Sequence, residues 1–467
     1  MTIEETLLAF EAKYPFLYEI EVNGFPVYTC LREALFAILT GANTGQNTNV
    51  LEEKGRIYPK RILDSFIKLR KFSRAETLVF TSAVFRRDFG RNLAAEYLIE
   101  KYPDAVVFEW PSRTDAYDSA YFSDEKKNKY CPLDFYLVFY KSYKLLHKKE
   151  YIRLEERCRE RLLRDFEKAL AKESEAEKKA ASYLIAHIPE AYAATAISQQ
   201  IFCRLFSKYK NTKYAIDFWG GARENIIPVL PGNVNAIELQ HGIITKDHTG
   251  YIYPKGADHL CKRFFDRTLL VYGESTKQLL VRNSVFRAER IEVIGNPRVL
   301  MYKEIYASKN ENRKMVLFTS QPFEKDGIPG YYQSVIPILR AFGEGLPEGF
   351  SMGVKLHPRE NDGAVRVYEE ALPKCEVYDN ASPLFELLSK SYLHITVSST
   401  TLYEAALFGC PTVCLKFGDQ NPNRTYGFEV WSAETADEAT QLLKRCFDRE
   451  QYEKYLGHLI KETRRYM

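Results

Sequence analysis

Three short segments place imidazole, hydroxyl or basic side chains directly after apolar runs. They are Glu238–Gly242 (ELQHG), Lys355–Glu360 (KLHPRE) and Ser398–Glu404 (SSTTLYE). Short apolar runs are typical of buried strands, and α/β sheets bind ligands beyond the carboxyl ends of their strands. We therefore expect binding and chemistry at these three segments.

The first segment carries a histidine at the predicted strand end. Gly242 allows the backbone to turn sharply after His241. An imidazole titrates near neutral pH, so His241 fits a general base, and Glu238 and Gln240 could orient its ring. The alternative is a histidine that only satisfies a buried carbonyl group.

The second segment combines cationic groups that suit a phosphate ester. Strand alternation predicts Lys355 and His357 on one side of the strand, with Arg359 close behind. Such groups hold phosphate by charge-assisted hydrogen bonds and stabilise negative charge on a departing nucleotide. Ordinary surface charge at a strand end is the alternative.

The third segment opens a predicted helix with hydroxyl side chains. Ser398, Ser399 and Thr400 would lie beside free N–H groups at the positive end of the helix dipole, which favours phosphate. Thr401 and Glu404 also fit a capping box, which needs no ligand. The two interpretations are compatible.

Other residues are weaker candidates, because ordinary turns explain them equally well. Ser320 and Gln321 follow the predicted strand Met315–Thr319 and could contact a nucleotide. The remaining candidates are Asn296 and Arg298 in GNPR, Arg86 and Arg87 in Ser82–Asp88, and Asn421–Arg424.

The elements that position these segments alternate between strands and helices in two series. The pattern predicts an α/β protein with two doubly wound Rossmann-like domains facing a cleft. We expect an acceptor-side domain over 1–306, with a helical insertion at about 145–210, and a nucleotide-binding domain over 307–435. Charged helices over 436–467 are expected to pack back across the cleft.

Composition excludes several classes of function. The 467 residues carry a net charge of only +4, without the concentrated basic stripe that nucleic-acid binding needs. The motifs GxxxxGK[ST], GxGxxG, HExxH and Asp-x-Asp are absent, so we expect neither a cofactor nor a metal. No signal peptide or bilayer-length apolar run occurs, which predicts a cytoplasmic protein with at most peripheral membrane contact.

The order of the motifs QHG, GNPR, KLHP and SSTTLYEA with GCPTVCL, within Val234–Leu415, resembles GT-B glycosyltransferases of bacterial capsule and surface-polysaccharide synthesis. The nearest groups are capsule transferases that use CMP-sialic acid or CMP-Kdo, and CDP-glycerol glycerophosphotransferases. The resemblance implies donor phosphate on His357, phosphate or nucleotide on Ser398 and Ser399, ribose hydroxyls on Glu404, and His241 as base.

We therefore expect a metal-independent glycosyltransferase that moves a sugar from a CMP-linked donor to a surface polysaccharide or glycolipid. The alternatives are a CDP-glycerol or CDP-ribitol polyol-phosphate transferase, a non-hydrolysing UDP-sugar 2-epimerase, and a non-catalytic glycan-binding domain. Expected partners are the nucleotide-sugar donor, a glycan or lipid-linked acceptor, and peripherally the inner membrane.

Overall fold

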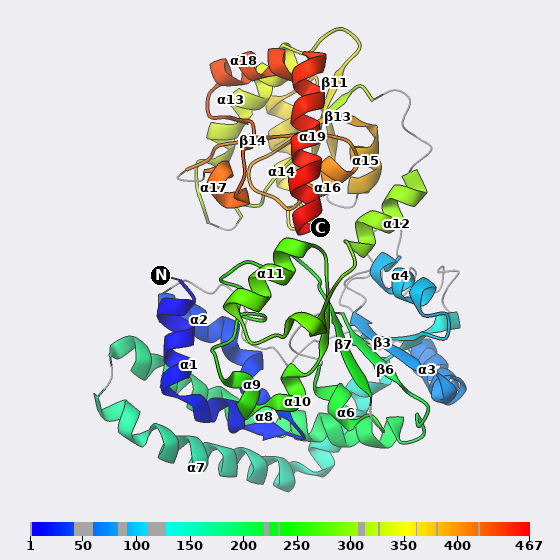
Figure 1. The fold of residues 1–467 in the computed structure, drawn as a ribbon, viewed down its shortest axis with the longest axis vertical. Helices are drawn as coiled ribbons and strands as arrows, with labels where there is room; N and C mark the ends of the chain where they lie inside the picture. The colour runs from blue at the N-terminus through cyan, green and yellow to red at the C-terminus, as the bar shows by residue number, and fades with distance from the viewer. Residues whose placement is uncertain are drawn as a thin grey trace. The chain divides into compact units, whose positions relative to one another are not determined.

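The computed structural model describes residues 2–41, 59–82, 91–110, 128–172, 174–218, 224–231, 234–306, 313–325, 327–360, 362–379, 382–418 and 421–467. They divide into two compact units, Met1–Ile294 and Gly295–Met467, each built around its own sheet (Figure 1). The candidates Arg86 and Arg87 lie outside the described residues.

Unit 1 contains a seven-stranded sheet in which every pair of neighbouring strands is parallel. Apolar runs such as TLVFT are buried along their whole length, as expected for strands covered by helices on both faces. The strands stand in the order β5 (Tyr130–Pro132), β4 (Val106–Trp110), β3 (Thr77–Ser82), β6 (Tyr214–Asp217), β7 (Asn235–Leu239), β8 (Thr268–Val271) and β9 (Ile291–Val293).

The two longest helices of unit 1 follow β5 and a shorter helix in the chain. The predicted helical insertion at about 145–210 contains these two helices, which span Lys148–Lys172 and Glu175–Phe206. Ser174 precedes the second helix, and its side chain caps that helix in a capping box with Glu177. The helices of unit 1 include α1 (Ala9–Lys13), α2 (Arg32–Thr40), α3 (Pro59–Lys71), α4 (Leu93–Lys101), α6 (Asp134–Leu146), α7 (Lys148–Lys172), α8 (Glu175–Phe206), α9 (Ala257–Leu260), α10 (Lys262–Phe265) and α11 (Glu274–Asn283).

A buried ion pair ties the N-terminal helices to the loop after β7. Arg32 on α2 donates to both carboxylate oxygens of Glu11, at 2.5 and 2.9 Å. Its guanidinium also donates to the backbone oxygens of Thr249 and Ile252. Both side chains are only 1% exposed, so each charge depends on the other.

Unit 2 contains a six-stranded parallel sheet with the classical Rossmann strand order. Its strands stand in the order β12 (Glu376–Tyr378), β11 (Ser351–Lys355), β10 (Met315–Thr319), β13 (Ser391–Thr396), β14 (Thr412–Leu415) and β15 (Ser432–Ala433). Its helices are α12 (Pro297–Tyr306), α13 (Tyr331–Glu344), α14 (Asp362–Ala371), α15 (Leu384–Lys390), α16 (Thr401–Leu407), α17 (Pro422–Tyr426), α18 (Ala436–Cys446) and α19 (Arg449–Tyr466).

The division between the units falls earlier than the predicted boundary at 306/307. Helix α12 belongs to unit 2 because Tyr302 stacks on Phe385 of α15, with ring centroids 4.1 Å apart. The C-terminal helices also belong to unit 2, where α18 packs on α13 and α19 packs on α16 (Figure 1). The prediction of two Rossmann-like domains is confirmed.

Among the described residues, no helix combines the length and the apolar character that crossing a membrane requires.

Substituting Arg32 tests the importance of its buried ion pair. In Arg32→Ala, the carboxylate of Glu11 loses its partner inside the core, and the free energy of unfolding should fall by about 3–5 kcal/mol. Calorimetry should show the loss as a lowered melting temperature for unit 1. The control is Arg449→Ala, which removes an exposed pair with Glu453 and should leave the transition unchanged. Equal stability of both variants would contradict the prediction.

Candidate functional site

In unit 2, the predicted segments Lys355–Glu360 and Ser398–Glu404 lie at one edge of the sheet, together with Ser320 and Gln321. Strand β10 lies between β11 and β13, and all three are parallel. Their carboxyl ends are Thr319, Lys355 and Thr396, so the loops that follow leave the sheet side by side. The strand order also reverses between β10 and β13, which is where such sheets bind ligands.

A buried carboxylate joins the first two of these loops. Glu360 accepts the hydroxyl of Ser320 and the backbone N–H of His357, the latter at 2.8 Å. The same N–H also lies 3.0 Å from the Ser320 hydroxyl oxygen. Burial raises the pKa of Glu360, while these hydrogen bonds and the charge of Lys355 oppose the rise. The network fixes the backbone from which the His357 side chain projects.

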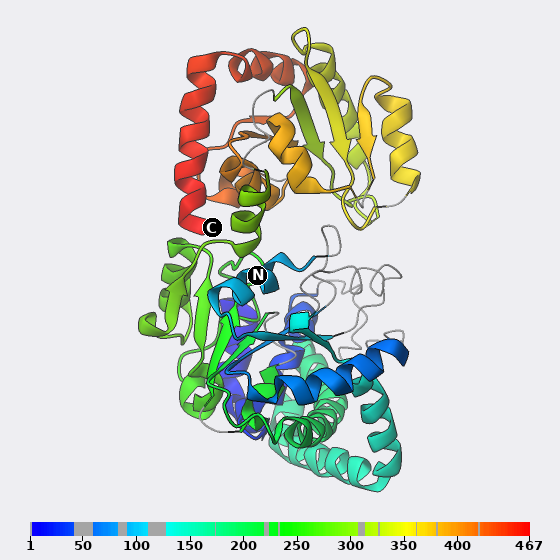
Figure 2. The ribbon, with the colours of Figure 1, turned by 90° about the vertical axis from the view of Figure 1, so that its right-hand side faces the viewer.

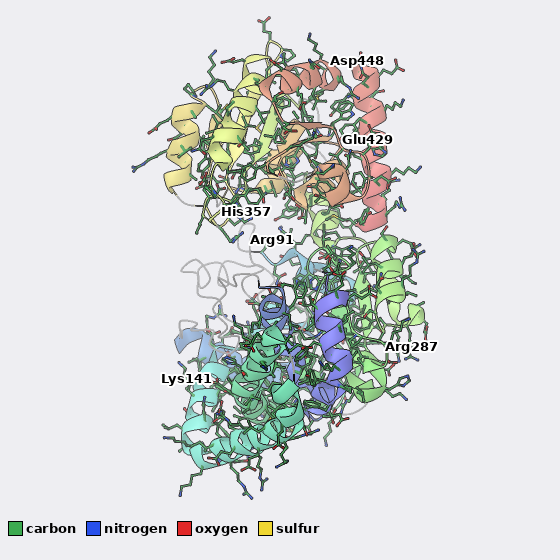
Figure 3. All side chains as sticks on the ribbon, turned by 90° about the vertical axis from the view of Figure 1, so that its left-hand side faces the viewer. Arg91, Lys141, Arg287, His357, Glu429 and Asp448 are labelled. Atoms are coloured by element: carbon green, nitrogen blue, oxygen red, sulfur yellow. The ribbon has the colours of Figure 1, made fainter. Side chains whose placement is uncertain are left out.

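His357 lies at the surface end of this network (Figure 3). Its Nδ1 accepts the backbone N–H of Arg359 at 3.1 Å. In the neutral ring the proton then resides on Nε2, which makes that atom a hydrogen-bond donor. A donor on a fixed loop at the sheet edge is suited to an anionic oxygen.

The other two basic residues of this segment differ in position. Lys355 is 4% exposed, and its ammonium donates to the backbone oxygen of Leu356 at 2.7 Å. It therefore lies beneath the loop rather than beside His357, because the strand ends at Lys355 and alternation does not continue. Arg359 is exposed, and its backbone oxygen accepts from Lys325.

The loop after β13 is held by a tyrosine hydroxyl. Tyr426 accepts the backbone N–H of Ser399 at 2.8 Å and donates to the carbonyl oxygen of the same residue at 2.9 Å. The Ser399 hydroxyl lies 2.8 Å from that of Thr401. Ser398 and Ser399 are half-buried and Thr400 is exposed, so this loop presents hydroxyls at the sheet edge.

The predicted capping box at Thr401 and Glu404 is wrong. The helix begins at Thr401 itself, and its N-cap residue Thr400 makes no side-chain capping bond. Instead, Ser399 accepts the backbone N–H of Thr401 at 3.2 Å. Glu404 is 8% exposed within the helix, which leaves its expected ribose contact a prediction.

Sequence reasoning missed the residues that brace this edge. Tyr331 accepts the backbone N–H of Gln321 at 3.0 Å and thereby holds the loop after β10. Tyr426 holds the loop after β13 in the same way. Glu360 was visible in KLHPRE, but nothing in the motif marks it as the centre of a network. Tyrosines are frequent in this sequence, so neither Tyr331 nor Tyr426 carried a signal.

In unit 1, Gln240 shapes the loop that carries His241. Its side-chain oxygen accepts the backbone N–H of Tyr272 at 2.7 Å, and its amide donates to the oxygen of Gly242 at 2.6 Å. We had expected Gln240 to orient the imidazole. In the structure it instead fixes the backbone around the histidine.

His241 is half-buried beside two aromatic rings. Its ring lies 6.2 Å from that of His248 and 6.4 Å from that of Tyr251. Its Nδ1 is buried without a hydrogen-bond partner among the described residues. Burial lowers the pKa of His241, and the charge of Glu238 opposes this only in part. A neutral imidazole at neutral pH is able to accept a proton.

Glu238 has a different role from the catalytic one that its position suggested. Its carboxylate is 1% exposed and lies 2.8 Å from the guanidinium of Arg267. An ion pair of this kind accounts for a buried charge on β7. His241 is thus the titratable residue that β7 delivers to its own carboxyl end.

The remaining candidates lie in unit 2. Asn296 caps helix α12, since its side-chain oxygen accepts the backbone N–H groups of Arg298 and Val299 at 3.1 and 3.4 Å. The Arg298 guanidinium lies over the ring of Phe385. Asn423 accepts the backbone N–H of Val430, which stabilises the turn after α17. Within the described ranges, no three His, Cys, Asp or Glu side chains form a metal-binding group.

Comparison with known proteins supports the fold and leaves the activity open. No family model matches the chain. Uncharacterized protein MJ1060 of Methanocaldococcus jannaschii is 28% identical over 152 residues, which is 31% of this chain and 26% of that protein. The chain therefore spans about a quarter of the length of this relative.

Several solved structures are similar over most of the chain. A protein provisionally assigned as UDP-N-acetylglucosamine 2-epimerase from Listeria monocytogenes aligns with a TM-score of 0.51 and 13% identity, over 84% of this chain and 93% of its own. The UDP-GlcNAc 2-epimerase of Neisseria meningitidis, bound to UDP-GlcNAc, gives 0.50 and 13%, over 83% and 93%. The wall teichoic acid polymerase TagF gives 0.44 and 11%, over 87% and 88%. The predicted GT-B fold is confirmed.

The environment of His248 predicts an acid-sensitive stability of unit 1. Burial, followed by the charge of His241, lowers the pKa of His248 from 6.5 to about 4. Between pH 6.5 and pH 4, His248 binds a proton more readily in the unfolded chain than in the folded protein. The free energy of unfolding therefore falls as the pH is lowered from 6.5 to 4.

The variant His248→Gln should lose about 2 kcal/mol less over this interval than the parent protein does. Urea denaturation of both proteins at several pH values measures the difference. Identical pH dependence in the two proteins would show that His248 is not buried in its neutral form.

Proposed function

We propose that this protein is an enzyme that acts on a nucleotide-activated sugar, whose phosphate binds at the carboxyl edge of the unit 2 sheet. The observation that carries the proposal is the network of Ser320, Glu360 and His357 beside the hydroxyl loop Ser398–Thr400. It supplies a fixed imidazole donor and several hydroxyl donors at the switch point of a Rossmann sheet. The bound UDP-GlcNAc of the similar Neisseria epimerase supports a ligand of the same class.

The arrangement can stabilise a departing nucleotide without large movement. The donor on His357 is set by its Nδ1 contact to Arg359 N–H, and the hydroxyl loop is held by Tyr426. Hydrogen bonds from donors that are already oriented become stronger as negative charge develops on the leaving phosphate. The protein does not have to reorganise to form them. Gln321, fixed by Tyr331, contributes a polar side chain to the same edge.

Transfer to an acceptor is the reaction we favour from the order of the sequence motifs. In it, the neutral imidazole of His241 removes the proton from an acceptor hydroxyl. The acceptor oxygen bonds to the donor, the bond between donor and nucleotide breaks, and the nucleotide leaves with the electron pair. A CMP-linked sugar or a CDP-linked polyol phosphate fits this scheme equally, and the acceptor would be a surface glycan or glycolipid.

Epimerisation of a UDP-sugar is the second candidate, and the comparisons favour it more than they favour transfer. The two solved structures with TM-scores of 0.51 and 0.50 carry the name UDP-GlcNAc 2-epimerase, one of them provisionally. Incubation with UDP-GlcNAc alone separates the candidates. NMR would show a second sugar configuration without any acceptor for an epimerase, and no change for a transferase.

Removing the imidazole of His357 should weaken nucleotide binding. The variant His357→Ala loses one hydrogen bond to a charged oxygen, so we expect affinity to fall about 10- to 100-fold. Calorimetry with CMP, CDP and UDP measures the change, and the half-buried His458 on α19 of the same unit provides the control variant His458→Ala. Unchanged affinity in His357→Ala would exclude phosphate binding by this residue. If the parent protein binds none of these nucleotides, the proposed function fails.

Replacing His241 should affect turnover and leave nucleotide binding intact. The variant His241→Asn removes the base, and the rate should fall about 10²- to 10⁴-fold. Nucleotide affinity should not change, because the phosphate site belongs to unit 2. The control is His259→Asn, on the exposed side of α9. A variant at position 241 that retains full turnover would remove His241 as the base.

A further inference from the structure

Unit 1 exposes a group of large apolar side chains on two neighbouring helices. Exposure reaches 65% at Leu63 on α3 and 81% at Leu146 on α6, where complete burial is the norm for a core leucine. We name this group the α3–α6 surface, and its members are Leu63, Phe66, Ile67, Val138, Phe139, Leu145 and Leu146.

The apolar side chains form one continuous face. Leu63, Phe66 and Ile67 are spaced by three and four residues, so they project from the same side of α3. The ring of Phe66 lies 6.0 Å from that of Phe139 on α6, which joins the two helices at this face. Figure 2 shows α3 in blue beside the cyan helices. A contiguous apolar face of this kind marks an interaction site more often than scattered residues do.

The opposite sides of α3 and α6 are already occupied by the core. Arg61 forms a fully buried ion pair with Asp134 at 3.0 Å, and the hydroxyl of Ser65 donates to the oxygen of Pro132. These contacts fix both helices without help from the exposed side chains. The α3–α6 surface therefore lies on helices that buried contacts hold in place.

Basic side chains lie on the same two helices and at the start of the helix that follows α6. Arg70 and Lys71 end α3, Lys141 lies on α6, and Lys148 and Lys149 begin α7. All five are exposed, and none has an ion-pair partner among the described residues. Figure 3 shows Lys141 at the outer side of unit 1.

The nearby acids do not balance this charge. Asp64 pairs with Lys68 at 2.9 Å, and Glu150 lies 3.4 Å from His147. The α3–α6 surface thus combines apolar residues with a surplus of positive charge. This combination is concentrated here although the whole chain carries a net charge of only +4.

We propose that the α3–α6 surface docks the protein onto a lipid bilayer that contains anionic headgroups. The apolar side chains enter the boundary between headgroups and acyl chains, and the five basic residues contact lipid phosphates. A second copy of this chain is the less suitable occupant, because pairing like surfaces would bring the same uncompensated cations together. Docking of this kind is separate from nucleotide binding, which involves unit 2.

Vesicle co-sedimentation of the full chain tests the proposal. The protein should pellet with vesicles of phosphatidylcholine and phosphatidylglycerol, much less with phosphatidylcholine alone, and should be released at ~0.5 M salt. The variant Lys141→Glu/Lys148→Glu should weaken partitioning by on the order of fivefold for each positive charge lost. The variant Leu145→Ser/Leu146→Ser should weaken it at least tenfold by removing inserted apolar area.

Matched controls separate docking from general charge and hydrophobicity. Lys454→Glu/Lys461→Glu changes the net charge equally on exposed positions of α19, and Val281→Ser/Ile328→Ser removes exposed apolar groups elsewhere. Both controls should bind vesicles as the parent protein does. Equal binding by all variants, absence of binding to anionic vesicles, or equal binding to neutral vesicles would overturn the proposal. So would a dimer in light scattering that Leu145→Ser/Leu146→Ser converts to a monomer.

Discussion

The candidate site depends on the order of strands in the unit 2 sheet. With β10 between β11 and β13, and all strands parallel, three loops must leave the sheet at one edge. The chain turns in opposite directions after β10 and β13, which leaves backbone groups at that point without ladder partners. Protein side chains occupy the backbone N–H groups of these loops, so a ligand would meet the imidazole and the hydroxyls that the loops carry. The fold brings the three loops together, and side chains must then hold the conformations of those loops.

The side chains that fix it act mainly on the backbone. Glu360 receives the N–H of His357, Tyr331 receives that of Gln321, and Tyr426 receives that of Ser399. Gln240 does the same in unit 1 through Tyr272 and Gly242. A buried polar side chain that satisfies a loop amide replaces a sheet hydrogen bond and removes conformational freedom. This is why the exposed residues of the motifs can be pre-oriented for a ligand.

Sequence reasoning predicted the features that depend on local pattern. Strand β10 was predicted at its exact bounds, Met315–Thr319, because an apolar run is a local signal. The break at Ser174 and the membership of α12 depend on contacts, namely a capping box and the stacking of Tyr302 on Phe385.

The same limit applies to the site. The residue types at the sheet edge were visible in KLHPRE and SSTTLYE, whereas the burial of Lys355 and the pairing of Glu238 with Arg267 were not. Burial decides the chemistry in each case. The charge of Glu238 is neutralised by Arg267, and burial lowers the pKa of His241. The fold alone therefore does not select the reaction. We propose instead that the reaction depends on His241, which follows β7 and whose Nδ1 has no hydrogen-bond partner among the described residues.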